Sequence, residues 1–296
     1  MTSAQPHKTV RELIQVTSDW FEEKSVESAK LNAERLLGDV LGLTRMELFL
    51  QHDRPVVGAE LDRFRELVRR RGAGEPLQQI LGETEFYSRT FKVEPGVFIP
   101  RPETERLVEA CCDLLAPGDH SKVAPVAVEI GCGTGIIGVT LALELPRLKV
   151  YATDVNPNAV YLAERNAHLL GCDVRMEFLQ GSRFAPLPAH LKGQVDLLVS
   201  NPPYIPTGEI PELSGEVKDH DPRDALDGGE DGLNVYRAIA GEMRAWVRPG
   251  GHVAFEIGFD QGPQVKEILE ASGAQDVKVI ADYADLDRVV IARLDR

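Results

Sequence analysis

Hydrophobic side chains in the first 82 residues recur every three or four positions, as in residues 36–41. This spacing places them on one face of an α-helix. Residues 9–12 and 44–47 both read Thr-x-x-Glu, the capping-box pattern in which a hydroxyl and a carboxylate bind the first free N–H groups of a helix. Gly42 and Gly72 stand where C-terminal helix caps are expected. We therefore predict that this segment is a small, all-helical domain.

The pattern changes after residue 82. Residues 86–87 and 90–93 form two short segments rich in aromatic and β-branched side chains, and Pro95-Gly96 follows them. Such segments with a turn signal at the end predict a β-hairpin.

Beyond Pro102, strand-like and helical patterns alternate along the chain. The strand candidates are residues 126–130, 150–153, 174–178, 195–200, 252–257, 277–280 and 289–292. Helical patterns at 136–145 and 159–170 separate the earlier candidates. This alternation predicts an α/β fold, with a mostly parallel sheet of seven strands and helices on both faces. Ligands of such sheets bind at the carboxyl ends of the strands.

These patterns divide the chain into three predicted parts: a helical domain over residues 1–82, a hairpin linker over 83–100 and an α/β domain over 101–296. The length of 296 residues suits two domains of roughly 150 residues each. The longest stretch without a charged side chain, residues 130–143, is shorter than the ~20 apolar residues of a membrane-spanning helix. Because the first thirty residues contain charges and no apolar core, we expect no signal peptide and no membrane attachment.

The balance of charge is acidic, with 33 basic and 47 acidic residues and a net charge of −14. Non-specific nucleic-acid binding depends on Lys and Arg, so we expect no direct DNA binding. The densest basic cluster comprises Arg63, Arg65, Arg69, Arg70 and Arg71, and its simplest interpretation is a solvated helix face. Four cysteines without CxxC spacing and seven scattered histidines predict neither a disulfide framework nor a metal site, which favours the cytoplasm.

A glycine-rich segment follows the first strand of the α/β domain. Residues 131–135 read Gly-Cys-Gly-Thr-Gly, and Gly138 completes the spacing of a dinucleotide fingerprint. Glycines allow a sharp turn and let a ligand lie against main-chain N–H groups. Asp154 follows the second strand, where a carboxylate can accept hydrogen bonds from ribose hydroxyls. Loop and acid together favour a cofactor that contains adenosine, without distinguishing a nicotinamide or flavin from other such cofactors.

The sequence Asn-Pro-Pro-Tyr at residues 201–204 follows the fourth strand. Two prolines fix the backbone and supply no N–H donors, and the residue before a proline is extended. The resulting edge displays an amide, bare carbonyls and an aromatic ring, which suits a flat, conjugated NH2 group. The Asn201 oxygen and the Pro202 carbonyl can each accept one hydrogen of that group, while Tyr204 packs on its face.

With these residues in place, the chain resembles the class I S-adenosylmethionine-dependent methyltransferases, and among them the release-factor glutamine methyltransferases (the PrmC/HemK family). The resemblance covers nearly the whole chain. Besides the helical segment, it comprises residues 98–105 (Phe-Ile-Pro-Arg-Pro-Glu-Thr-Glu), the loop at 129–135, Asp154, residues 201–204 and the glycine-containing stretch at 221–233. Asn-Pro-Pro-Tyr alone is shared with methylases of adenine, guanine and protein amides. The stretch at 99–105, together with the helical domain, narrows the match.

The resemblance implies a Rossmann-like catalytic domain that binds S-adenosylmethionine and releases S-adenosylhomocysteine. It implies cofactor contacts from Gly131, Cys132, Gly133, Thr134, Gly135, Asp154, Arg183 and Asn201. Arg183 stands where the family often has a tryptophan near the adenine, and a guanidinium plane can stack there as well. It further implies that Asn201, Pro202, Pro203 and Tyr204 bind the substrate, with Asn201, Pro202 and Tyr204 as the catalytic residues.

The family also implies the substrate, which is the glutamine side chain in the Gly-Gly-Gln loop of peptide chain release factors, in translation termination. Two other substrates stay open: a glutamine of a ribosomal protein, and the amino group of adenine in nucleic acid, presented as a flipped base. A non-enzymatic binding module is a further alternative. We expect a cytoplasmic monomer whose helical domain contacts the release factor, with the basic cluster at residues 63–71 as a candidate surface.

Overall fold

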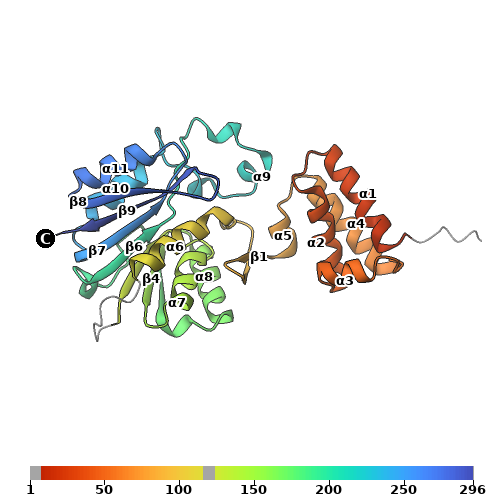
Figure 1. Ribbon diagram of the computed structural model, residues 1–296, viewed down its shortest axis with the longest axis horizontal. Coiled ribbons are helices and arrows are strands. Elements are labelled where there is room, and N and C mark those ends of the chain that lie inside the picture. Colours follow the sequence, from red (N-terminus) through yellow and green to blue (C-terminus); the bar gives the residue numbers. More distant parts are fainter. Residues whose placement is uncertain (1–7, 116–123, 296) are drawn as a thin grey trace, which may run out of the picture. The chain divides into compact units, whose positions relative to one another are not determined.

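The computed structural model describes residues 8–115 and 124–295, and these form two compact units, Met1–Glu83 and Thr84–Arg296. The first unit is helical and the second holds a central sheet (Figure 1). Each unit has hydrophobic cores of its own.

The helical unit contains α1 (Val10–Glu23), α2 (Ala29–Leu41), α3 (Arg45–Leu50), α4 (Gly58–Gly72) and α5 (Leu77–Leu81). Its core is formed by apolar side chains at the predicted helical spacing, among them the fully buried Leu36 and Leu37. Both predicted capping boxes are present. The hydroxyls of Thr9 and Thr44 accept hydrogen bonds from the N–H groups of Glu12 and Glu47, and the carboxylates of these glutamates accept from the threonine N–H groups. The predicted helical bundle is therefore confirmed.

Two expectations within this unit are wrong in detail. Gly42 caps α2 in the left-handed conformation, but Gly72 is the last residue of α4 and the cap is Ala73. Gly72 is needed for packing instead, because a Cβ atom there would lie 2.1 Å from the Trp20 ring. Arg71 does not belong to a solvated face: it is buried and donates to Asn32 Oδ1 over 2.7 Å.

The predicted hairpin is present as β1 (Glu83–Phe86) and β2 (Arg89–Lys92). Tyr87 and Ser88, the two residues between the strands, have φ angles of 51° and 59°. Two successive positive φ angles are typical of the tight turn that matches the twist of paired strands.

The second unit is built on a seven-stranded sheet of order β5-β4-β3-β6-β7-β9-β8. Its strands are β3 (Val126–Ile130), β4 (Lys149–Asp154), β5 (Met176–Gln180), β6 (Val195–Ser200), β7 (Val247–Glu256), β8 (Ala274–Ala281) and β9 (Asp287–Leu294). Only β9 runs against the others, since it pairs antiparallel with both β7 and β8. All seven strands of the predicted mostly parallel sheet are thus confirmed.

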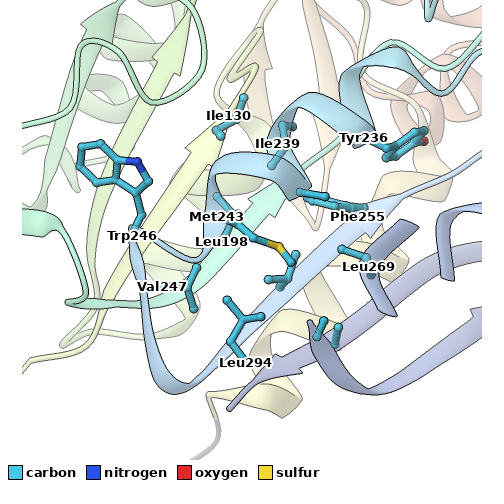
Figure 2. Packing of buried hydrophobic residues seen from close by; sticks show 14 of the residues in the cluster. Ile130, Leu198, Tyr236, Ile239, Met243, Trp246, Val247, Phe255, Leu269 and Leu294 are labelled. Carbon is cyan, nitrogen blue, oxygen red and sulfur yellow. The ribbon is translucent and has the colours of Figure 1, made fainter. Parts of the chain in front are cut away.

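Helices cover both faces of this sheet (Figure 1). One face packs on α6 (Glu105–Leu114), α7 (Ile136–Glu144) and α8 (Pro157–Leu169), and the other on α10 (Asn234–Met243) and α11 (Gly262–Ala271). Successive residues of a strand point to opposite faces of the sheet. Ala127 packs in the first core, beneath α6, α7 and α8, and Val128 packs in the second core, beneath α10 and α11. Figure 2 shows the second core, where Met243 of α10 and Leu269 of α11 pack against strand residues such as Phe255.

Short helical segments connect these elements, among them 3-10 turns at Ala189–Leu191, between β5 and β6, and at Ile210–Glu212, which follows β6. A 3-10 turn at Pro102–Thr104 leads into α6, and α9 (Gly215–Lys218) with a turn at Arg223–Ala225 lies between β6 and α10. A further 3-10 turn, Asp173–Arg175, replaces the expected start of the third strand, so that β5 begins at Met176.

Candidate active site

The second unit contains a cavity of about 790 Å³ at the carboxyl ends of β3, β4 and β6. β3 is the neighbour of both β4 and β6 in the sheet, so the segments that follow these three strands meet at one edge. Residues 131–134 of the glycine loop, Asp154 and residues 201–204 line this cavity, whereas Gly135 is not among its lining residues. The structure therefore brings together the residues that the sequence singled out.

The glycine loop holds its backbone open toward the cavity. Gly131, Gly133 and Gly135 have φ angles of 75°, 53° and 82°, a region that side chains disfavour. Apart from the adjoining residues of the chain, no atom of the described residues lies within 4 Å of an added Cβ at Gly131 or Gly133. At Gly135 the Cβ would lie 2.9 Å from Ala163 Cβ of α8. The first two glycines therefore leave space for a ligand, whereas the third permits close packing of the loop on a helix.

Asp154 is fixed by the backbone around it. Its Oδ2 accepts a hydrogen bond from the Gly133 N–H and its Oδ1 from the Asn156 N–H, each over 2.9 Å. Burial raises the pKa of this carboxyl, and these N–H groups oppose the shift. Each carboxylate oxygen can accept a further hydrogen bond, so a rigid, two-oxygen acceptor faces the cavity beside the glycine loop.

Glu129 lies beneath the loop and was not among the predicted site residues. Its Oε2 accepts from the Gly138 N–H over 3.1 Å, and a Cβ at Gly138 would collide with this carboxyl. Burial raises the pKa of Glu129 to about 8, and Oε1 has no hydrogen-bond partner within the described part of the chain. Gly138, the third glycine of the fingerprint spacing, thus makes room for a buried carboxyl rather than for a ligand.

Residues 201–204 form the opposite wall of the cavity. The carbonyl of Tyr204 accepts a hydrogen bond of 2.8 Å from Gln261 Nε2, and a Cβ at Gly232 would lie 2.3 Å from the same oxygen. Ile205 forms a parallel bridge with Asp227. The stretch at 221–233 that carried the resemblance therefore supports the Asn-Pro-Pro-Tyr edge from behind.

Tyr204 is largely buried in its wall, and burial raises the pKa of its phenol to about 12. The phenol therefore stays neutral at physiological pH. Part of the ring packs against the core of the sheet. Such a side chain can offer a ring face or a neutral hydroxyl, but it is no ready base.

Arg183 lines the same cavity from a left-handed backbone position with φ 49°. Its Nε donates to Glu242 Oε1 over 3.0 Å, and Nη1 lies 3.4 Å from Ser182 Oγ. The guanidinium is thus within reach of the cavity but is bonded to α10. Stacking of Arg183 on an adenine ring stays a prediction.

Several residues of the cavity have no role predicted from the sequence. Phe98 lines the cavity, and the Arg101 guanidinium lies 5.3 Å from its ring centre. Arg101 also forms an ion pair of 2.6 Å with Asp221, whose carboxylate is fully buried and accepts from the Ile99 N–H. Val155, next to Asp154, is an exposed apolar side chain at the rim. Their positions depend on long-range contacts that no local spacing reveals.

Residues 8–115 and 124–295 contain no group of three or more His, Cys, Asp or Glu side chains that could hold a metal ion. In the same residues, no helix has both the length and the apolar character needed to cross a membrane.

Comparison with known proteins defines the class first. Residues 89–212 match the methyltransferase small domain. The chain is similar in fold to a methyltransferase from Pyrococcus furiosus, with a TM-score of 0.50, 19% identity and coverage of 70% of this chain and 89% of that one. The second unit is therefore a class I methyltransferase domain, as the sequence predicted.

The family follows from closer relatives. Residues 12–82 match the PrmC N-terminal domain. The release factor glutamine methyltransferase of Moorella thermoacetica is 45% identical over 90% of this chain and 92% of its own length. That of Chlorobaculum tepidum is 42% identical over 95% of each chain. The chain belongs to the release factor glutamine methyltransferase family, which confirms the family resemblance found in the sequence.

Proposed function

We propose that this enzyme transfers a methyl group from S-adenosylmethionine to the side-chain amide nitrogen of the glutamine in the Gly-Gly-Gln motif of peptide chain release factors. The observation that carries the proposal is the shared cavity: the residues predicted to bind the cofactor and residues 201–204 line one space of about 790 Å³. Family membership supports the same activity.

The residues present fit S-adenosylmethionine. The open positions at Gly131 and Gly133 would let its methionine part lie against main-chain N–H groups near the start of α7. The rigid carboxylate of Asp154 would accept hydrogen bonds from both ribose hydroxyls. Cys132 and Thr134 are buried within the loop and shape it, while Arg183 and Val155 are candidates for the adenine.

The substrate amide would bind at the edge formed by residues 201–204. The Asn201 Oδ1 atom and the Pro202 carbonyl would each accept one N–H of the amide. Pro203 would stiffen the edge, since it fixes φ and has no N–H group. Tyr204 would pack on the amide plane. The two hydrogen bonds would hold the amide plane in one orientation. The nitrogen lone pair would then point in one fixed direction, toward the methyl group.

The bound sulfonium cofactor supplies an activated methyl group. An amide nitrogen is a weak nucleophile because its lone pair is delocalised into the carbonyl, so the main task of the protein is alignment. Orientation of this kind can supply about 7–11 kcal/mol in favourable cases. Acceptance of the amide hydrogens by Asn201 and Pro202 increases electron density on nitrogen. The methylated nitrogen is acidic and loses its proton without a dedicated base, which agrees with the neutral phenol of Tyr204.

The proposal is tested by substitution of Asn201. Asn201→Ala leaves one amide hydrogen without an acceptor, and loss of one such transition-state hydrogen bond typically lowers the rate by ~10²–10³. Full-length release factor, in excess over enzyme saturated with S-adenosylmethionine, is assayed in single turnover, and mass spectrometry locates the methyl group. Wild-type enzyme is expected to methylate the Gly-Gly-Gln glutamine.

Tyr204→Phe is the matched control, because it keeps the ring and is expected to retain much of the activity, whereas Tyr204→Ala is expected to be slow. Ribosomal protein and DNA are offered in separate reactions. Methylation of adenine or of a ribosomal protein in preference to the release factor would replace the proposed substrate. A wild-type rate in Asn201→Ala would overturn the role of the Asn-Pro-Pro-Tyr edge.

We also propose that the helical unit contributes a second contact with the release factor, because a three-residue motif is too short to define a protein partner. Arg63, Arg65 and Arg69 lie on the exposed side of α4. Because Arg71 is buried and Arg70 forms an ion pair with Glu75, these three remain as the candidate surface.

A further inference from the structure

Asn201 has a buried polar environment on the side opposite to its proposed substrate. Its Nδ2 donates to Thr104 Oγ1 over 3.4 Å. Thr104 is fully buried at the end of the 3-10 turn that precedes α6. Thr104 belongs to the motif at residues 98–105, and the sequence predicts no separate role for it.

Glu256 completes this environment. β6 and β7 are parallel neighbours in which Ser200 pairs with Phe255, so Asn201 and Glu256 follow at the same level of the sheet. Glu256 is only 2% exposed. The Glu256 carboxyl is close enough to Thr104 and Asn201 for both side chains to lower its pKa, while Oε2 has no hydrogen-bond partner among the described residues. The mechanism proposed above uses neither Thr104 nor Glu256.

The orientation of the Asn201 amide decides whether it can bind the substrate. An amide has one end that only accepts and one that only donates, and the substrate NH2 group needs the accepting end. A hydroxyl both donates and accepts, so Thr104 alone would tolerate either orientation. An ionised carboxylate only accepts. It therefore requires donation from Thr104 and Asn201, which keeps Asn201 Nδ2 on the buried side and leaves Oδ1 for the cavity.

We propose that Thr104 and Glu256 are positioning residues of the methyl transfer: they bind the donor end of the Asn201 amide and so direct its acceptor end at the substrate. The inference rests on the proposed function of Asn201. It extends the site from the visible Asn-Pro-Pro-Tyr edge to two buried residues of other segments, one before α6 and one at the end of β7.

The protonation state of Glu256 matters for this role. Burial raises its pKa to about 7, opposed by hydrogen bonds from Thr104 and Asn201 and by Arg288 of β9. Glu103 raises the same pKa, and the buried phenols of Tyr204 and Tyr236 are its other titratable neighbours. A protonated carboxyl can donate, and it would then bind Asn201 Oδ1 and favour the flipped amide. The productive orientation is therefore lost as the pH falls through about 7.

The test compares Thr104→Val, which removes the hydroxyl at nearly equal volume, with Thr104→Ser, which keeps it. In steady-state methylation of release factor, kcat of Thr104→Val is expected to fall about tenfold to a hundredfold, as for a small misplacement of a reacting group. KM for the release factor and the calorimetric affinity for S-adenosylmethionine are expected to change less than threefold. Thr104→Ser is expected to recover most of kcat.

Glu256→Gln supplies the second measurement. Wild-type kcat is expected to decline below a pH of about 7, and this decline is expected to disappear in Glu256→Gln, whose rate is lower than the wild-type maximum. If Thr104→Val does not fold, the pH profile of Glu256→Gln decides alone. Wild-type kcat in Thr104→Val, or an unchanged pH profile in Glu256→Gln, would overturn the positioning role. Failure of the wild-type enzyme to methylate the glutamine would instead refute the proposed function.

Discussion

Asp154 is tied to the main chain around the proposed cofactor site, because each of its oxygens accepts one main-chain N–H. Asp154→Ala removes these bonds and the proposed acceptor for ribose. Hydrogen bonds to a charged group contribute about 1.5–3 kcal/mol, so the affinity for S-adenosylmethionine is expected to fall by roughly tenfold to a hundredfold or somewhat more. Isothermal calorimetry measures this change.

Glu267→Ala, which removes an exposed carboxylate of α11, is the matched control and is expected to bind as the wild type does. Unchanged affinity in Asp154→Ala would reduce Asp154 to a turn residue. Thermal unfolding of the ligand-free protein separates loss of a contact from loss of the loop.

The sequence singled out those candidate site residues whose immediate neighbours or backbone requirements are unusual. Gly131 and Gly133 require positive φ, and Asn201 precedes two prolines, so each is marked by its immediate neighbours. Thr104 and Glu256 carry no such mark. Their buried contacts join segments far apart in the chain, as in the bond of Asn201 to Thr104 at a separation of 97. Spacing along the chain contains no information about such pairs.

Among the helices, α4 offers a test of packing that a capping interpretation would not suggest. Gly72→Ala places a methyl group within 2.2 Å of two Trp20 ring atoms. Overpacking of this kind typically costs about 1–3 kcal/mol, so the helical unit is expected to unfold at a lower urea concentration. The chain has two tryptophans, Trp20 and Trp246. A Trp246→Phe background therefore makes Trp20 fluorescence a reporter of the helical unit.

Gly241→Ala in α10 is the control, because nothing lies within 4 Å of its added Cβ. In a helix interior alanine is favoured over glycine by about 1 kcal/mol, so the second unit of this variant is expected to match or exceed wild-type stability by circular dichroism. Because Gly241 lies outside the helical unit, the Trp20 transition is expected to stay unchanged. Equal stability of Gly72→Ala and wild type would show that Trp20 moves aside without cost.

Among the strands, the sequence predicted the apolar central parts correctly but did not predict where each strand begins and ends. β6 has the predicted bounds, since five of its six residues are buried. β7 begins at Val247, before the predicted residue 252, through a polar stretch held by the ion pair of Arg248 with Asp196. The third strand begins late because Val174, although β-branched, lies in a 3-10 turn and is 89% exposed. Tertiary contacts decide these boundaries.

For the whole molecule, the acidic net charge of −14 makes the basic face of α4 distinctive. Arg63→Glu/Arg69→Glu reverses two exposed charges of the helical unit. If this face contacts the release factor, KM for the intact factor is expected to rise on the order of tenfold, with a weaker dependence on salt. KM for a short Gly-Gly-Gln peptide is expected to stay unchanged, because the peptide reaches only the cavity.

Lys149→Glu/Lys278→Glu makes the same change in net charge at exposed positions of β4 and β8, and it is expected to leave both KM values near wild type. Equal effects of the two double variants would point to general repulsion. No change in the Arg63→Glu/Arg69→Glu variant would move the second contact elsewhere.

The strand order also determines when the site can exist during synthesis. β3 and β6 are neighbours in the sheet, yet Ser200 donates to the Ile130 carbonyl from a position 70 residues later in the chain. A nascent polypeptide therefore completes the glycine loop and Asp154 before residues 201–204, the opposite wall, have been synthesised. Glu256 emerges later, and Arg288 beside it only with β9, almost at the C-terminus. The helical unit has short-range contacts and can fold first, whereas closure of long loops is slow. A chain released before β9 is made would keep much of the proposed cofactor-binding wall but lack the strand that joins β8 to β7, so methyl transfer depends on a strand translated well after that wall.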